Sequence, residues 1–167
     1  IDRVVAAHRE KWKELWQGDI EIEGDDEAQR VVRMALYNLY SFGRGGTGLS
    51  IPPMGLSSQG YNGHVFWDSE IWMFPPMLMM NGDIAESMID YRCNRLAAAK
   101  TRAAACGYQG AMFPWESDDS GQEATPSWAT TGQFEQHITG DIAFAAWNYY
   151  CVMQDREWLR LKGWPLI

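Results

Sequence analysis

The sequence predicts an all-α fold, and two observations indicate it. In several segments apolar residues recur at three- and four-residue spacing, while no segment sustains the period-two alternation typical of a β-strand. The helical segments also come in pairs, separated by two long loops, the first of them rich in glycine. We therefore expect three stacked helical hairpins, and a length of 167 residues is consistent with a single core.

The first hairpin is expected to begin with a helix over residues 5–16, which Gly18 ends. Either Asp25 or Asp26 can cap its second helix. His8 lies on the apolar stripe of the first helix, so we expect it to be a buried core histidine. The apolar stripe of the second helix consists of Ala28, Val32, Ala35, Leu36 and Leu39.

The second hairpin follows a glycine-rich loop over residues 43–63. A helix is expected to start near Trp67 and to be interrupted at Pro75 and Pro76, because proline breaks a helix interior but suits a first turn. Asp83 is expected to cap the long helix that follows, which carries an alanine run toward its end.

The third hairpin follows a second long loop, over residues 106–135. Its last helix is expected to begin at Asp155 and to be cut short by Gly163 and Pro165. Loops as long as these two are usually functional when they occur inside a compact domain. The first helix of this hairpin carries the apolar residues Ile142, Ala145, Ala146, Tyr149 and Val152.

Composition argues against several functional classes. The net charge of −8 would repel a nucleic acid, and no apolar run reaches the roughly 20 residues that a membrane span needs. No zinc, P-loop or serine-hydrolase motif occurs, so we expect no metal and no cofactor. Three cysteines without a Cys-x-x-Cys motif predict buried free thiols, and most of the nine tryptophans are expected to pack in the core.

One motif occurs twice, as GYNGHVFWDSE in residues 60–70 and as GYQGAMFPWESDD in residues 107–119. Its glycines allow a tight turn or a close approach to a ligand. Each copy places a tryptophan beside a carboxylate, and a sugar can stack on the indole while its hydroxyls donate to the carboxylate. Stacked hairpins bring equivalent loops to one face, so we predict one saccharide pocket. The two pairs are Trp67 with Asp68 and Trp115 with Glu116.

Other residues of these segments are candidates for the same pocket. Tyr61, His64 and Glu70 belong to the first copy and are expected to contact the sugar. His137, within QFEQHITGDIAF, can either bind a ligand hydroxyl or orient a loop. The structural alternative is that Asp68 caps a helix and that Glu70 lies in its first turn.

Four segments of the chain resemble glycoside hydrolase family 65. Three look like consecutive blocks of that family, namely GYNGHVFWDSEIWMFPPMLM, GYQGAMFPWESDDSGQE and QHITGDIAFAAWNYY. HREKWKELWQGDIEIEGD resembles the segment that leads into the family's catalytic barrel. The family includes maltose, trehalose and kojibiose phosphorylases, acid trehalases and related α-glucoside hydrolases. The resemblance implies an (α/α)6 barrel, of which residues 1–167 would be roughly the N-terminal half, truncated at both ends.

The resemblance also implies an inverting reaction on a terminal α-linked glucose. It places the glucose of subsite −1 on Trp67 and Asp68, and it makes Trp115 and Glu116 part of the same pocket. The family's general acid is a glutamate in a Pro-[Asp/Asn]-Glu-Tyr block that this sequence lacks. We therefore expect the acid and the base beyond Ile167, with Glu116 as the alternative acid.

Three functions follow as hypotheses. The first is hydrolysis of a saccharide such as kojibiose or trehalose, because FWDSEIWMFPPMLM and GYQGAMFPWES look closer to the hydrolase branch. The second is phosphorolysis, with inorganic phosphate as a further partner. The third is a non-catalytic carbohydrate-binding module, or a bare structural fragment. An α-glucoside is the expected ligand, and the rest of the enzyme would complete the barrel. A hydrolase is expected in the periplasm or outside the cell, a phosphorylase in the cytoplasm.

Overall fold

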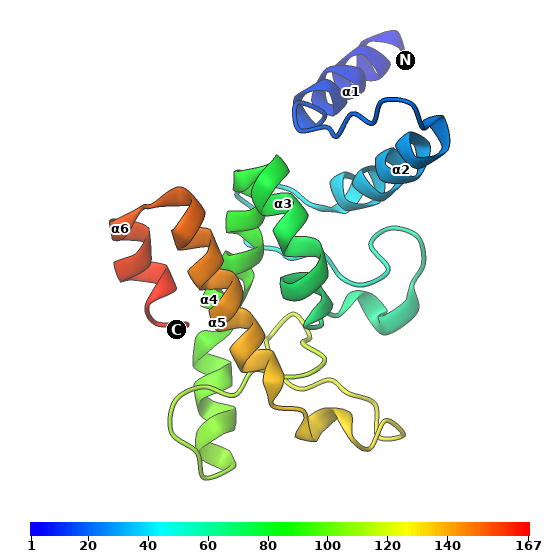
Figure 1. Ribbon diagram of the computed structural model, residues 1–167. Helices are drawn as coiled ribbons and strands as arrows, with labels where there is room; N and C mark the ends of the chain where they lie inside the picture. The colour runs from blue at the N-terminus through cyan, green and yellow to red at the C-terminus, as the bar shows by residue number, and fades with distance from the viewer.

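The computed structural model describes residues 1–167 and consists of helices joined by loops (Figure 1). The α-helices are α1 (Asp2–Leu15), α2 (Asp26–Phe42), α3 (Phe74–Met80), α4 (Gly82–Ala105), α5 (His137–Met153) and α6 (Arg156–Trp158). Short 3-10 turns cover Gly60–Gly63 and Gly132–Phe134, and π turns cover Ser69–Met73 and Leu159–Gly163. Extended pairing is limited to isolated bridges, so the predicted all-α class and the three helix pairs are confirmed.

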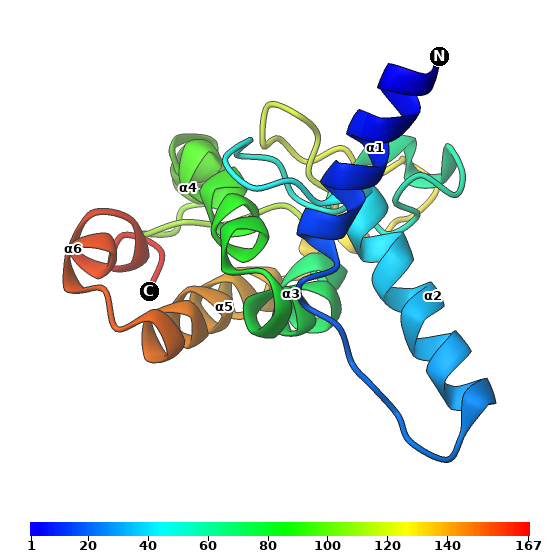
Figure 2. The same ribbon diagram turned by 90° about the horizontal axis from the view of Figure 1, so that it is seen from above.

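The helix pairs are arranged around the hairpin of α3 and α4. Both views show α1 and α2 on one side of the molecule and α6 on the other, with α3, α4 and α5 between them (Figures 1 and 2). The helices α3, α4 and α5 pack against one another. None of the helices is long and apolar enough to cross a membrane.

The helix starts follow the expected caps in two of three cases. The carboxylate of Asp25 accepts hydrogen bonds from two amides of α2, and Asp155 does the same for α6. The cap of α4 is Asn81, whose side chain accepts from the Ile84 amide at 3.2 Å, and not Asp83. Because the helix already begins at Gly82, Asp83 lies in its first turn, where its charge favours the helix dipole.

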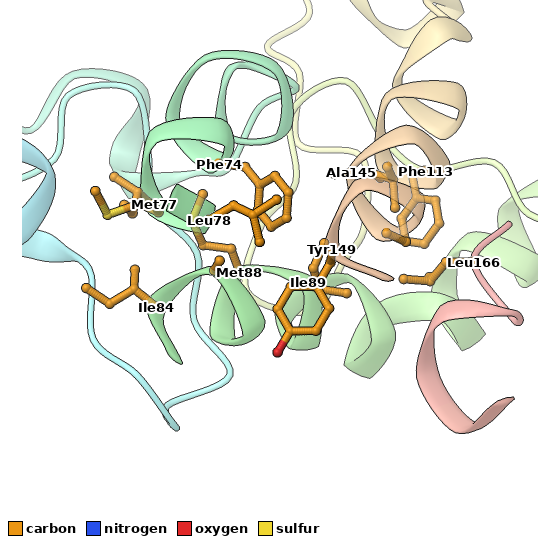
Figure 3. Packing of buried hydrophobic residues seen from close by; sticks show 14 of the residues in the cluster. Phe74, Met77, Leu78, Ile84, Met88, Ile89, Phe113, Ala145, Tyr149 and Leu166 are labelled. Atoms are coloured by element: carbon orange, nitrogen blue, oxygen red, sulfur yellow. The ribbon is translucent and has the colours of Figure 1, made fainter. Parts of the chain in front are cut away.

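The core lies where α3, α4 and α5 meet (Figure 3). The predicted interruption at Pro75 and Pro76 is confirmed, because the π turn over residues 69–73 ends there and both prolines occupy the first turn of α3. This arrangement directs apolar residues of all three helices inward. They include Phe74, Met77, Leu78, Ile84, Met88, Ile89, Ala145 and Tyr149, joined by Phe113 from the second long loop.

The expected burial of His8 is wrong. His8 is exposed, because α1 buries none of its residues, although Trp12, one turn further on, stacks on Tyr37 of α2 with centroids 5.1 Å apart. The expectation that most of the nine tryptophans pack in the core is confirmed for five of them: Trp158 is buried in it, and Trp12, Trp16, Trp67 and Trp115 are partly buried and pack against it. Four indoles lie on outer faces that no other segment of this chain covers, namely Trp72, Trp128, Trp147 and Trp164.

The three cysteines are free, but they differ in exposure. Only Cys93 is partly buried, whereas Cys106 and Cys151 are exposed, so the expectation of three buried thiols is wrong. Burial raises the pKa of the Cys93 thiol to about 11, and the nearby carboxylate of Asp90 acts in the same direction.

Cys93 is therefore expected to react with iodoacetamide at pH 8 at least about 10-fold more slowly than either exposed cysteine, because the thiolate is the nucleophile. Mass spectrometry of timed aliquots measures the three rates. In urea the rates should converge. Equal rates in the folded protein would contradict the burial of Cys93.

Candidate functional site

The two copies of the repeated motif lie side by side. Val65 of the first copy and Ser117 of the second exchange both backbone hydrogen bonds, at 2.9 and 3.0 Å. Trp67 and Trp115 each lie two residues from this bridge. The structure thus confirms that the two loops meet.

The aromatic residues of the two copies interlock. Phe66 and Phe113 are buried, while Trp67 and Trp115 are half-buried and pack on the core. The ring of Phe66 meets the Trp115 indole edge to face, with centroids 5.1 Å apart. Each indole is therefore fixed on one side by the core and keeps part of its surface exposed.

The serine that follows each tryptophan–acid pair makes a hydrogen bond that links its copy of the motif to another segment of the chain. The Ser69 hydroxyl donates to the Ile51 carbonyl at 2.6 Å, and the Ser117 hydroxyl lies 2.9 Å from that of Tyr91. Both serines are buried. Sequence reasoning missed this role, although the presence of serine in both copies was its signal.

Asp68 is half-buried and accepts no hydrogen bond from the chain. It precedes the π turn over residues 69–73, but its side chain makes no capping hydrogen bond. The structural alternative is therefore wrong for a side-chain cap by Asp68, whose carboxylate oxygens remain available to a ligand, but right in placing Glu70 in the first turn.

Glu116 is 2% exposed and is linked to the other copy through a histidine. Its Oε1 lies 2.7 Å from Nδ1 of His64. A carboxylate oxygen accepts, so Nδ1 of His64 is the donor in this contact when it carries the proton. No side-chain group of the chain bonds to Oε2 of Glu116, which leaves that atom to accept from a ligand.

Glu70 does not have the ligand-facing position that the sequence suggested. It is 3% exposed, and its two oxygens accept from Nε and Nη2 of Arg92 at 2.7 and 2.8 Å. Burial raises the pKa of Glu70, and the Arg92 guanidinium opposes that effect. The physical reason for the correction is that both oxygens are occupied by an internal cation.

Tyr61 is exposed on a left-handed turn. Tyr61 and Asn62 have φ of 56° and 54°, unusual values for residues with a Cβ, and the Tyr61 ring meets Phe66 edge to face at 5.1 Å. In the second copy the amides of Gly107 and Tyr108 bond to carbonyls of α4, an arrangement that ends the helix. Gly107 thus serves helix termination, with φ of 81°, and not a close approach to a ligand.

His137 forms a side wall against Trp67. Its ring meets the indole edge to face, with centroids 5.0 Å apart. Nδ1 lies 2.6 Å from a carboxylate oxygen of Asp141, and Nε2 lies 3.8 Å from Glu135. Of the two roles considered for His137, this geometry favours orientation of the site.

Glu123 is a residue of the site that sequence reasoning did not identify. Its carboxylate accepts from the amides of Trp115 and Glu116 at 3.1 and 3.2 Å, and it pairs with Arg102 at 2.7 Å. The only sequence signal was its place in the acidic run over residues 116–123.

One hollow adjoins these residues and a second lies elsewhere, and neither contains the tryptophan–acid pairs. One, of about 510 Å³, includes His64, Tyr91 and Ser117 in its lining. The other, of about 880 Å³, lies between α1 and the start of α4. The structure has no group of three or more His, Cys, Asp or Glu side chains placed to hold a metal ion.

The fold and the paired loops define a class of protein. Paired helical hairpins whose loops meet at one place form the architecture of an α/α barrel. The chain belongs to glycosyl hydrolase family 65, since residues 33–167 match the model of that family's central catalytic domain.

Individual relatives agree with this membership. The chain is 61% identical over 165 residues to a kojibiose hydrolase of Flavobacterium johnsoniae, a match that covers 99% of this chain and 24% of that protein. It is 42% identical over 179 residues to a kojibiose phosphorylase of Thermoanaerobacter brockii, covering 100% and 23% of the two chains. The chain spans about a quarter of the length of the curated relatives it matches.

A solved structure confirms the fold class. It is of a human-microbiome protein provisionally described as a kojibiose phosphorylase, and it superposes with a TM-score of 0.87 at 27% identity over 98% of this chain and 24% of that one. The expected helical barrel of the family, of which this chain forms a part, is thereby confirmed.

Proposed function

We propose that this chain forms the subsite −1 wall of an enzyme that hydrolyses terminal α-linked glucose, with inversion, from kojibiose or a related saccharide. The observation that carries the proposal is the backbone bridge between Val65 and Ser117, which holds the two tryptophan–carboxylate pairs together. Membership of family 65 and 61% identity to a kojibiose hydrolase support it.

In this proposal the two tryptophan–carboxylate pairs have different roles in the pocket. Trp67 offers a stacking surface and Asp68 two free acceptors, so they would hold the glucose. Trp115 and Glu116 would line the adjoining wall, with His64 fixing one oxygen of Glu116.

The proposal extends to residues around the two pairs. Tyr61 would lie at the rim of the pocket, since its side chain is exposed. The general acid and base would lie beyond Ile167, in the part of the enzyme that completes the barrel.

Hydrolysis is favoured over phosphorolysis by the difference in identity. The chain is 61% identical to the Flavobacterium hydrolase and 42% to the Thermoanaerobacter phosphorylase. The intact protein is therefore expected to release free glucose from kojibiose at the same rate with and without inorganic phosphate.

Product analysis by nuclear magnetic resonance tests this expectation. Inversion of an α-glucoside predicts that β-glucose appears first and then mutarotates. Formation of glucose 1-phosphate in the presence of phosphate would instead identify a phosphorylase of the same family. Glucose binding without turnover of any α-glucoside would favour a carbohydrate-binding module.

A further inference from the structure

A buried arginine of α4 contacts the chain on both sides of the Trp67–Asp68 pair. Arg92 is 0% exposed. Its Nη2 donates to the Phe66 carbonyl at 3.2 Å, and its Nε and Nη2 donate to the Glu70 carboxylate at 2.7 and 2.8 Å. One planar guanidinium thus fixes the residue before the pair and the second residue after it.

The backbone held in this way has an unusual form. The amides of Glu70 and Ile71 both bond to the Trp67 carbonyl, at 3.0 and 3.1 Å, and residues 69–73 then form a π turn. Such π turns are rare in proteins, and those that do occur are often found at functional sites. The π turn begins directly after Asp68, so the pair lies at its start.

Stability alone does not account for this arrangement. A buried ion pair is often no more stabilising than apolar residues of similar volume, because desolvation offsets the attraction. The Nη1 nitrogen of Arg92 is also buried without a hydrogen-bond acceptor, which adds an unfavourable contribution. The position is therefore better explained by what the guanidinium holds in place.

We propose that Arg92 is a positioning residue, which clamps Phe66 and Glu70 so that Trp67 and Asp68 keep their orientation toward the sugar. The inference rests on the proposed function, and it adds a residue that touches no substrate. Lysine cannot replace it fully, because one ammonium lacks the fork that reaches a carboxylate and a carbonyl together.

The test compares four forms of the intact protein: wild type, Glu70→Met/Arg92→Met, Arg92→Lys, and the control Met88→Ala. The double variant removes the clamp without leaving a buried charge, so its melting temperature should stay near that of wild type. Its kcat/KM for kojibiose should fall about 10- to 100-fold, because small displacements of binding groups have effects of this size. Amides of residues 67–73 should exchange hydrogen faster.

The control removes core packing one turn away from Arg92 on α4. Met88→Ala should lower the melting temperature but leave kcat/KM and exchange at residues 67–73 near wild type. Arg92→Lys should show an intermediate loss of kcat/KM.

Two outcomes would contradict the proposed positioning role of Arg92. One is wild-type kcat/KM in the double variant; the other is an equal loss of kcat/KM in Met88→Ala. If the double variant does not fold, wild-type kcat/KM in Arg92→Lys overturns it equally. Absence of α-glucoside turnover in the unmodified protein contradicts the proposed function itself, which separates the two failures.

Discussion

Asp68→Asn is expected to lower kcat/KM for kojibiose about 10²- to 10³-fold while changing the free energy of unfolding by less than about 0.5 kcal/mol. The carboxylate accepts no hydrogen bond from the chain, so the fold does not depend on its charge. Two sugar hydroxyls that donate to an ionised carboxylate contribute about 1.5–3 kcal/mol each, and asparagine keeps the shape but loses the charge. Steady-state kinetics and urea unfolding measure the two effects.

Asp118→Asn is the matched control, because the Asp118 carboxylate, unlike that of Asp68, accepts hydrogen bonds from the chain. It accepts from the amides of Ser120 and Gln122 at 2.8 and 2.9 Å. Although burial acts to raise it, the hydrogen bond from the Ser120 hydroxyl, together with those from the amides, holds the pKa of Asp118 below its usual value. The ionised Asp118 carboxylate therefore stabilises the fold at pH values above its pKa in the unfolded chain, and this stabilisation is lost as the pH falls through its pKa in the folded protein. Asp118→Asn should thus lower the free energy of unfolding at pH 7 but leave kcat/KM unchanged.

The reverse result for Asp68→Asn would restore the structural interpretation. A loss of stability with unchanged kcat/KM would mean that Asp68 supports the turn over residues 69–73 and that the sugar lies elsewhere. Equal losses in Asp68→Asn and Asp118→Asn would mean that neither carboxylate is specific to the ligand.

Features of the fold that depend on neighbours in sequence could be predicted. The caps Asp25 and Asp155 bond to amides two and three residues ahead, which a local pattern specifies. The exposure of His8 could not be predicted, because periodicity identifies an apolar stripe but not whether another helix covers it. The cap of α4 was predicted at Asp83 but is Asn81, two residues earlier, because the helix already begins at Gly82.

The same distinction applies to the site. Trp67 and Trp115 could be identified because the motif repeats, and the hairpin order brought the copies together. The position of Glu70 depends on Arg92, 22 residues further along the chain. A carboxylate has the same local sequence signal whether it faces a ligand or a buried cation. Its role is decided by tertiary packing.

Glu123→Ala is expected to lower the free energy of unfolding by about 2–4 kcal/mol and to weaken glucose binding about 10-fold. The loss has three sources. The amides of Trp115 and Glu116 lose their acceptor, and Arg102 loses its carboxylate partner in a half-buried setting. The amide and the hydroxyl of Thr125, which donate to Oε1 of Glu123 at 3.3 and 2.6 Å, lose their acceptor as well. Because the amides of Trp115 and Glu116 fix the second tryptophan–acid pair, loosening them should disturb the wall of the pocket. Urea unfolding and calorimetry with glucose measure the two effects.

Two further variants separate the sources of that loss. Glu135→Ala changes the same residue type in the same loop, where the carboxylate lies 3.8 Å from His137 and is 44% exposed, so it should cost little stability. Glu123→Gln keeps an acceptor for the amides but loses the charge that faces Arg102. If Glu123→Gln binds glucose as wild type does, the amide contacts hold Trp115 and Glu116 in place. If it binds as weakly as Glu123→Ala, the ion pair to α4 holds them, and the second loop depends on the same helix that carries Arg92.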